Sequence, residues 1–307
     1  MEPEARDIVI VLGPTAVGKS RVAVDLALKF NGEVISGDSI QVYRGFDIGT
    51  DKPGPASMRG VPHHLIDIVG PEVQFTAADF VREALAAAGA IASRGRLPLV
   101  AGGTGLYLRA LVDGLFPGPG RDPAVRAGLE AEAREKGLDI LFRRLEAVDP
   151  EYAAKVRSRD RVRIVRALEV HALTGEPISV HFLRTESPVR DRNVLRLGLR
   201  LERADLVRRI EERVERMFER GLVEEVRGLL ARGVPETAPP FRALGYRHVV
   251  AHLRGRMSLD AAVSLTKADT RQYAKRQMTW FRKMDGVAWF SPEDRAGLEE
   301  YIQNHLQ

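Results

Sequence analysis

One short run near the N-terminus constrains the fold of this chain more than any other feature. Residues 8–12 are apolar and mostly β-branched, and residues 21–30 have the spacing of a helix. A strand, a glycine-rich loop and a helix in this order predict a phosphate-binding loop (P-loop), whereas a chance glycine turn with a lysine fits the flanks poorly. The loop has the pattern Gly-x-x-x-x-Gly-Lys-Ser: Gly13, Pro14, Thr15, Ala16, Val17, Gly18, Lys19 and Ser20.

The residue types in this loop suit a di- or triphosphate. Gly13 and Gly18 allow the backbone to turn its N–H groups inward. The helix that follows directs the positive end of its dipole at the same place. Lys19 adds a cation, and Ser20 adds a hydroxyl group that suits Mg²⁺. The loop alone does not say which phosphate compound is bound.

Strands and helices alternate after the P-loop. Buried strands are predicted at residues 33–36, 64–69 and 97–101. A capping box at Thr76–Asp79 begins a helix that ends before Gly95. This alternation is typical of an α/β protein in which helices flank a parallel sheet.

Two polar residues follow predicted strands, and we expect them beside the P-loop. Ligands of such sheets lie beyond the carboxyl ends of the strands, which is where Asp38 and Thr104 fall. P-loop ATPases and GTPases normally carry a second acidic strand end that helps to hold Mg²⁺. Residues 97–101 are followed instead by Gly-Gly-Thr. Asp38 is therefore the candidate for an Mg²⁺ partner or a general base, and the alternative is an aspartate that caps a turn.

Two stretches rich in turn-forming residues, 116–120 and 185–188, indicate domain boundaries. Only helical patterns lie between them, and a strand pattern returns at residues 193–199. We therefore predict a P-loop core in two parts, residues 1–116 and 193–307, around an all-α insertion domain at residues 117–192. The second part of the core is predicted to be mostly helical, at residues 204–220, 223–231, 241–253 and 259–284, with a last strand at 287–290.

The composition is that of an ordinary globular protein, and cysteine is absent from its 307 residues. Disulfides and thiolate metal sites are thereby excluded, and we expect a reducing, cytoplasmic location. The first residues do not have the pattern of a signal peptide, and no apolar run approaches the ~18 residues of a membrane span, so we expect no membrane association.

The net charge of +5 favours a polyanionic partner only weakly, so the positions of the charges matter more. Five arginines lie between residues 157 and 166 against one acid, and ten Lys or Arg lie between residues 242 and 283 against two. On a helical wheel, Lys267, Arg271 and Lys275 share one face, whereas Gln277 and Phe281 share another. These clusters predict contacts with a nucleic-acid backbone, and the alternative is a solvated basic face.

Eight segments together resemble the tRNA dimethylallyltransferase family, also called tRNA isopentenyltransferases. The likeness runs in order from about residue 7 to 290. Position 37 is Gly where the family usually has Ala, which we expect to loosen the turn beside Asp38 slightly. The segments are residues 13–20, 36–45, 47–53, 61–67, 102–107, 163–169, 221–226 and 270–277.

The resemblance implies an activity and roles for several residues. The family transfers a dimethylallyl group from dimethylallyl diphosphate to the exocyclic amine of the adenosine just 3′ of the anticodon, with Mg²⁺. The P-loop would then hold a diphosphate leaving group, and Ser20 would bind Mg²⁺, with Asp38 as an optional second ligand. Asp38 would act as the general base and Thr104 would orient the amine or the diphosphate. Arg213 would be a second diphosphate clamp, or else a surface arginine.

The resemblance also implies residues that contact tRNA, through the anticodon stem-loop. Asp38 to Gln41 would meet a flipped-out target base. Residues 162–166 of the insertion would grip the anticodon stem, and such backbone contacts position RNA without reading its sequence. The full set is Asp38, Ser39, Ile40, Gln41, Thr104, Arg126, Val162, Arg163, Ile164, Val165, Arg166, Arg242, Gly245, Tyr246, Arg247, Arg271, Lys275, Arg276 and Gln277.

Two other functions remain open at this stage. A nucleotide or small-molecule kinase would share the α/β core, although the missing second acidic strand end and the basic helices argue against it. A non-catalytic RNA-binding protein that uses a nucleotide as a switch would bind RNA without turnover. We expect a monomer that binds tRNA and dimethylallyl diphosphate.

Overall fold

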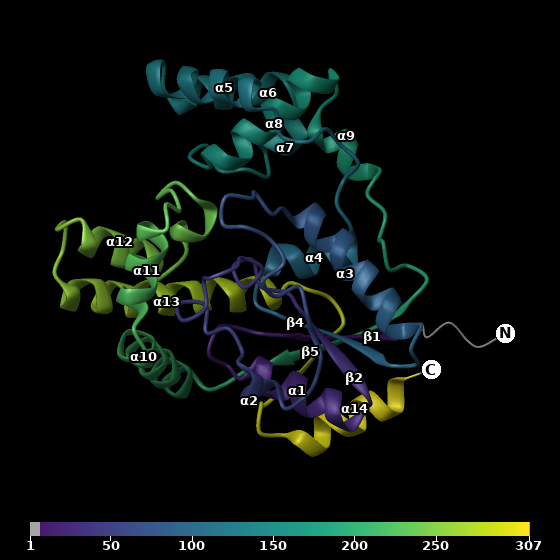
Figure 1. Cartoon of the computed structure of the whole chain (residues 1–307). Helices are drawn as coiled ribbons and strands as arrows, with labels where there is room; N and C mark the ends of the chain where they lie inside the picture. Colours follow the sequence, from purple (N-terminus) through teal and green to yellow (C-terminus); the bar gives the residue numbers. More distant parts are fainter. Residues whose placement is uncertain (1–6, 307) are drawn as a thin grey trace. The chain divides into compact units, whose positions relative to one another are not determined.

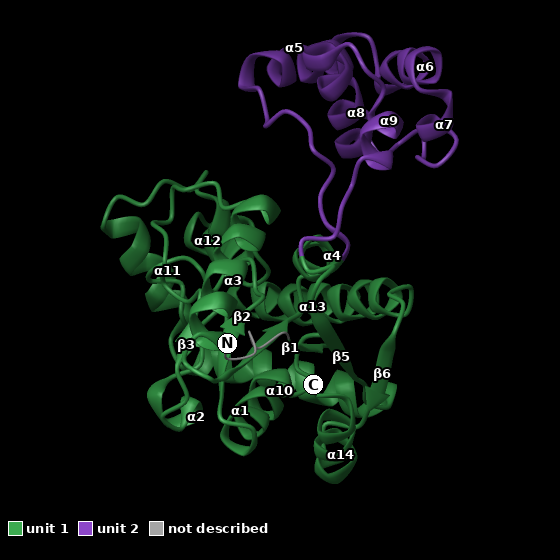
Figure 2. Cartoon of the chain, turned by 90° about the vertical axis from the view of Figure 1, so that its right-hand side faces the viewer, with its two compact units in different colours: residues 1–112, 189–307 green, residues 113–188 purple. Residues whose placement is uncertain are grey.

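The computed structural model describes residues 7–306. The chain is divided at residues 112/113 and 188/189 into two compact units (Figure 2). The first unit is formed by the two terminal parts of the chain, and the second is the stretch between them. The second unit begins just before the turn-rich stretch at residues 116–120.

A six-stranded sheet with the order β3-β2-β4-β1-β5-β6 organises the first unit, and all its neighbouring strands are parallel (Figure 1). The α/β fold class predicted from the sequence, a P-loop core with helices on a parallel sheet, is confirmed. The strands are β1 (Asp7–Leu12), β2 (Gly32–Ser36), β3 (His63–His64), β4 (Leu97–Gly102), β5 (Asn193–Leu199) and β6 (Val287–Phe290).

β1 is buried along its whole length, because helices cover both faces of the sheet. Ile8 and Ile10 of β1 belong to one apolar cluster, and Val9 and Val11 belong to another on the opposite face. The helices of the first unit are α1 (Lys19–Lys29), α2 (Pro55–Met58), α3 (Ala77–Ala92), α4 (Gly105–Asp113), α10 (Arg203–Glu219), α11 (Leu222–Ala231), α12 (Tyr246–Leu253), α13 (Leu259–Phe281), α14 (Arg295–His305) and the 3₁₀ helix η1 (Pro239–Arg242).

The second unit, residues 113–188, is all-helical and has its own apolar core. Glu169 is fully buried at its centre, where it accepts hydrogen bonds from Arg126, Arg166 and the backbone N–H of Asp122. These cations hold the pKa of Glu169 below its usual value, although burial alone would raise it. Its helices are α5 (Pro123–Glu135), α6 (Leu138–Val148), α7 (Pro150–Ala153), α8 (Arg161–Thr174) and α9 (Ile178–Leu183).

Two local predictions were wrong. The third strand ends after two residues, because Leu65 and Asp67 adopt left-handed φ angles of 62° and 56° that break an extended chain. The helix expected at residues 241–253 is interrupted before α12, because Gly245 has a φ of 83°.

None of the helices in residues 7–306 has the length and hydropathy needed to cross a lipid bilayer.

The ends of β2 and β4 approach each other closely at two glycines. A Cβ atom on Gly102 would overlap the carbonyl oxygen of Gly37 and lie 2.8 Å from its Cα. A Cβ atom on Gly37 would lie 3.2 Å from both the Cα of Gly102 and the Cδ2 of Leu108. The loops that carry Asp38 and Thr104 are therefore held together by a backbone contact that requires glycine at position 102 more strictly than at position 37.

This asymmetry gives a stability prediction. Gly102→Ala should lower the free energy of unfolding by about 1–3 kcal/mol, because the methyl group meets backbone that cannot rotate away. Gly37→Ala is the matched control and should cost less, since part of its contact is the flexible end of Leu108. Urea unfolding of both variants measures the difference, and equal losses would contradict it.

Candidate active site

The loops that follow β1, β2 and β4 surround a cavity of about 280 Å³ in the first unit. The parallel sheet explains this arrangement, because the carboxyl ends of its strands meet at one edge. Helices α10 and α13 contribute the rest of the wall. The cavity is lined by Thr15, Ala16, Gly18, Lys19, Ser20, Arg21, Asp38, Gln41, Asp51, Ala101, Gly102, Gly103, Arg209, Arg213, Arg216, Tyr273 and Gln277.

The P-loop has the backbone geometry that its glycines predict. Gly18 has a φ of 105°, and a Cβ atom on Gly13 would lie 2.7 Å from the carbonyl oxygen of Leu199. Ala16 is also left-handed, with a φ of 65°. No side chain caps the N-terminus of α1, so the N–H groups of its first turn remain available to an anion.

Lys19 is the central cation of this cavity. Its Nζ donates a hydrogen bond to the carbonyl oxygen of Pro14 at 2.7 Å. Burial and the nearby guanidinium of Arg213 lower the pKa of Lys19 to about 7, and Asp38 opposes this shift. Lys19 therefore loses its proton at a much lower pH than an exposed lysine does.

Asp38 caps a turn with one of its two carboxylate oxygens. Its Oδ1 accepts hydrogen bonds from the backbone N–H groups of Ile40 and Gln41, at 2.8 and 3.3 Å. No hydrogen-bond donor among residues 7–306 reaches Oδ2. Thr104 lies next to this turn, and its Oγ1 accepts a hydrogen bond from the N–H of Ser39 at 3.1 Å. Asp38 therefore caps a turn through Oδ1, as the alternative interpretation expects, whereas its Oδ2 is not used in this turn.

Arg213 belongs to the cavity wall, since its guanidinium has three partners there. It donates to Thr15 Oγ1 at 2.6 Å and to the carbonyl oxygen of Thr50 at 3.2 Å, and it forms an ion pair with Asp51 at 3.1 Å. Gln41 donates to the same carbonyl of Thr50. These contacts fix the guanidinium beside the P-loop.

Two residues of α13 close the cavity from the side. Gln277 is buried, accepts a hydrogen bond from the N–H of Thr15 at 2.8 Å and donates one to the carbonyl oxygen of Gly103 at 2.7 Å. Its amide is thus used to join the P-loop to the end of β4. Burial raises the pKa of Tyr273 to about 12, and the charge of Asp38 adds to this effect.

Several residues of this wall were not predicted from the sequence, although two of them carry a recognisable signal. Arg209 and Arg216 lie four residues before and three after the predicted Arg213, so all three share one face of α10. Arg21 and Asp51 had no comparable signal, because the three-dimensional path of their loops brings them to the cavity.

The predicted RNA-contacting residues between 242 and 276 fall into two groups. Arg242, Lys275 and Arg276 are exposed. The others are engaged within the protein: Gly245 and Tyr246 are buried, Tyr246 donates to Glu225, Arg247 pairs with Asp269, and Arg271 pairs with Glu211.

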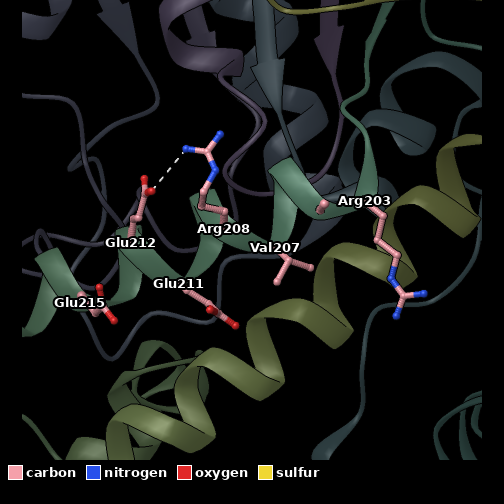
Figure 3. A pocket seen from close by; sticks show the side chains of 7 residues that line it. Arg203, Val207, Arg208, Glu211, Glu212 and Glu215 are labelled. Atoms are coloured by element: carbon pink, nitrogen blue, oxygen red, sulfur yellow. Dashed lines mark hydrogen bonds and ion pairs between the residues drawn. The ribbon is translucent and has the colours of Figure 1, made fainter.

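The basic face of α13, at Lys267, Arg271 and Lys275, is weaker than its sequence suggests, because glutamates of α10 pair with part of it. A second hollow runs along α10, and Figure 3 shows its mixed lining of arginines and glutamates. Glu211 and Glu215 of this lining pair with Arg271 and Lys267 of α13, at 2.6 and 2.5 Å. Two of the three named cations of this face, Lys267 and Arg271, are therefore paired with the neighbouring helix. The hollow is lined by Arg203, Ala204, Val207, Arg208, Glu211, Glu212 and Glu215.

The predicted contacts of the second unit are divided in the same way. Arg126 and Arg166 hold Glu169, and Ile164 and Val165 lie in the apolar core. Val162 and Arg163 are exposed at the start of α8. The neighbouring Arg157 and Arg159 are also exposed, and no carboxylate in residues 7–306 pairs with either of them.

A cavity formed around a P-loop at the carboxyl edge of a parallel sheet defines a P-loop α/β protein with a site for a phosphate-bearing ligand. The family model described as "IPP transferase" matches residues 41–284, and the one described as "Isopentenyl transferase" matches residues 6–70. The chain is 52% identical over 288 residues to a tRNA dimethylallyltransferase of Geobacter metallireducens, covering 94% of this chain and 93% of the relative. A tRNA dimethylallyltransferase of Thermomicrobium roseum is 49% identical over 307 residues, covering 98% and 92%.

Two solved structures are also similar to this chain. The tRNA isopentenylpyrophosphate transferase of Bacillus halodurans has a TM-score of 0.73 and 40% identity, with 98% of this chain and 97% of that chain covered. A eukaryotic dimethylallyltransferase acting on tRNA has a TM-score of 0.81 and 29% identity, with 98% and 76% covered. The chain belongs to the IPP transferase family.

The lowered pKa of Lys19 predicts pH-dependent anion binding. A bound diphosphate favours the charged lysine, so binding above about pH 7 must take up a proton, and affinity should fall by up to about tenfold per pH unit above that value. Calorimetric titration with pyrophosphate in buffers of different ionisation enthalpy measures this uptake. Lys19→Arg keeps its charge over this range and serves as the control, because the ligand's own protonation is common to both proteins. Equal proton uptake by the two proteins would contradict the prediction.

Proposed function

We propose that this protein transfers a dimethylallyl group from dimethylallyl diphosphate to the exocyclic amine of the adenosine 3′-adjacent to the anticodon in tRNA. Pyrophosphate is the second product. One observation carries the proposal: Asp38, whose Oδ2 has no hydrogen-bond donor among residues 7–306, lines the same cavity as the P-loop. The names of the relatives, tRNA dimethylallyltransferases, support the choice of substrates. The proposal includes a monomeric state and a cytoplasmic location, and the absence of cysteine favours the latter.

The reaction exchanges one bond for another. The bond between the allylic carbon and the diphosphate oxygen breaks, and a bond from that carbon to the adenine amine forms. The amine is a poor nucleophile because its lone pair is delocalised into the ring, and it must lose a proton during the transfer. Asp38 accepts this proton on Oδ2, while its Oδ1 stays fixed by the N–H groups of Ile40 and Gln41. Thr104 holds Ser39 in this turn, and we assign it the role of orienting the amine.

The leaving pyrophosphate gains negative charge as its bond breaks. The N–H groups at the start of α1, Lys19 and Arg213 surround the place where this charge develops. They are fixed before the reaction, since Arg213 has three partners in the wall and Thr15 is bound by Gln277. The P-loop therefore stabilises a leaving group, and no phosphoryl group is transferred.

The residues of the cavity fit a magnesium ion. Among residues 7–306 no three His, Cys, Asp or Glu side chains gather into a metal site. Mg²⁺ bound to a phosphate compound needs only one or two protein oxygen ligands, and the hydroxyl of Ser20 and the carboxylate of Asp38 both line the cavity. Ser20 would hold Mg²⁺, with Asp38 as an optional second ligand. When bound, Mg²⁺ neutralises charge on the diphosphate.

We assign the tRNA backbone contacts to basic residues that are exposed. Residues 38–41 and Thr104 meet the target base, which must leave its stack to reach an enclosed cavity. Arg242, Lys275 and Arg276 are the exposed cations of the first unit that contact the RNA backbone. In the second unit we assign contacts with the anticodon stem to the exposed start of α8 and the preceding loop, at Arg157, Arg159 and Arg163. Arg126 and Arg166 support these contacts by ordering the unit through Glu169.

The Asp38 assignment is tested by activity. Asp38→Asn should lower the rate of adenosine prenylation by about 100- to 10,000-fold and leave tRNA affinity unchanged, because the amide cannot accept the proton. The measurement is mass spectrometry of nucleosides after incubation with unmodified tRNA, dimethylallyl diphosphate and Mg²⁺. Asp139→Asn, in the second unit, is the control and should have full activity.

Two results would contradict different parts of the proposal. Full activity of Asp38→Asn would remove Asp38 as the base and leave the transferase function standing. Consumption of ATP without prenylated adenosine by the wild-type protein would make the cavity a nucleotide site of a kinase.

The tRNA assignment is tested by salt dependence. The double variant Arg157→Ala with Arg159→Ala should weaken tRNA binding. It should also make the slope of the logarithm of the binding constant against the logarithm of the salt concentration less steep by about 1 to 2 units, because fewer phosphate contacts release fewer counterions on binding. Arg166→Ala should instead destabilise the second unit, because it unbalances the buried Glu169. An unchanged slope in the double variant would show that these arginines make no backbone contact.

A further inference from the structure

The loop that follows β6, residues 291–294, lies against the P-loop although it is almost 280 residues away in sequence. It reaches this place because β6 is parallel to β5 and ends at the same edge of the sheet as β1. The Cβ of Pro292 is 3.6 Å from the position that a Cβ atom would occupy if Gly18 carried a side chain. Arg21 donates a hydrogen bond to the carbonyl oxygen of Pro292 at 3.3 Å.

Glu293 of this loop holds a cation that lines the cavity. Arg209 of α10 donates to Glu293 Oε1 at 2.6 Å, and its Nη1 lies 3.9 Å from the position of a Cβ on Gly18. The second oxygen of Glu293 accepts a hydrogen bond from Ser291 Oγ at 2.6 Å, which fixes the carboxylate. Arg21 lies 3.7 Å from the same carboxylate.

We propose that Arg209 is a further diphosphate-binding residue and that Glu293 is its resting partner. Arg209 leaves Glu293 when the diphosphate binds and returns to it when pyrophosphate departs. This inference rests on the proposed function, since it concerns the same cavity and the same leaving group.

The two cavity arginines differ in how firmly they are held. Arg213 is bound by Thr15, Thr50 and Asp51, and only 21% of its side chain is exposed. Arg209 has the single carboxylate of Glu293, and the side chains of this pair are 32% and 49% exposed. Exposed ion pairs contribute little free energy, whereas a phosphate offers several charged acceptors to a guanidinium. Exchange of partners is therefore favourable for Arg209 and unfavourable for Arg213.

The exchange gives Glu293 a role in product release. A carboxylate that competes for Arg209 weakens the hold on pyrophosphate once the prenyl group has left. The hydroxyl of Ser291 and the guanidinium of Arg209 keep the pKa of Glu293 below its usual value, so the competing group is charged at neutral pH.

The experiment is a double-mutant cycle on pyrophosphate binding with Mg²⁺, measured by calorimetry at one pH and salt concentration. The variants are Arg209→Gln, Glu293→Gln and the two combined. Glu299→Gln is the matched control, because Glu299 forms a similarly exposed ion pair with Lys29, 3.3 Å apart, between α14 and α1. Steady-state inhibition of prenyl transfer by pyrophosphate is measured alongside.

Arg209→Gln should weaken binding by about tenfold or more, the loss expected for charged hydrogen bonds. Glu293→Gln should tighten binding by about three- to tenfold and strengthen product inhibition, and it should have no effect when Arg209 is already Gln. Glu299→Gln should match the wild type.

Three results would overturn the inference: an unchanged affinity in Arg209→Gln, an unchanged or weaker affinity in Glu293→Gln, or an equal effect of Glu293→Gln in both backgrounds. The last would mean that Glu293 acts only through its charge. Wild-type protein that binds pyrophosphate without transferring a prenyl group would instead refute the proposed function and leave the exchange intact.

Discussion

All six strands of the sheet run in the same direction, and the rest of the site depends on this constraint. Every loop that follows a strand must emerge at one edge, whatever its distance along the chain. The P-loop, the turn at Asp38, the glycines after β4 and the loop at Glu293 meet for this reason. The close backbone contact between Gly37 and Gly102 then sets the spacing within the group. The arrangement of the loops around the cavity therefore follows from the backbone, before any side chain is considered.

Much of the core could be predicted because its signals are local. The apolar run of β1, the glycines of the P-loop and the capping box of α3 each specify their own conformation within a few residues. The position of Asp38 followed from a topological rule, which needs only the order of strands and helices. The break before α12 had no such signal, because Gly245 adopts its left-handed conformation where α12 packs against α11 and α13. A glycine in a helical pattern alone does not reveal this.

The charged residues show the main limit of sequence reasoning. A count of arginines gives the number of cations and says nothing about their partners. Arg166 counts as a surface cation in the sequence, yet in the structure it holds the buried Glu169. Arg271 and Lys267 face glutamates of α10, which are about 55 residues away along the chain. Only contacts between distant segments separate the cations that order the protein from those that are available to RNA.

The near-neutral lysine of the P-loop has a consequence for selectivity among anions. Recharging Lys19 against its burial and against Arg213 costs free energy, which the bound anion must supply. A diphosphate, with several negative charges, interacts with the charged form of Lys19 more strongly than a singly charged ion such as chloride does. The P-loop therefore favours polyvalent anions over singly charged ones.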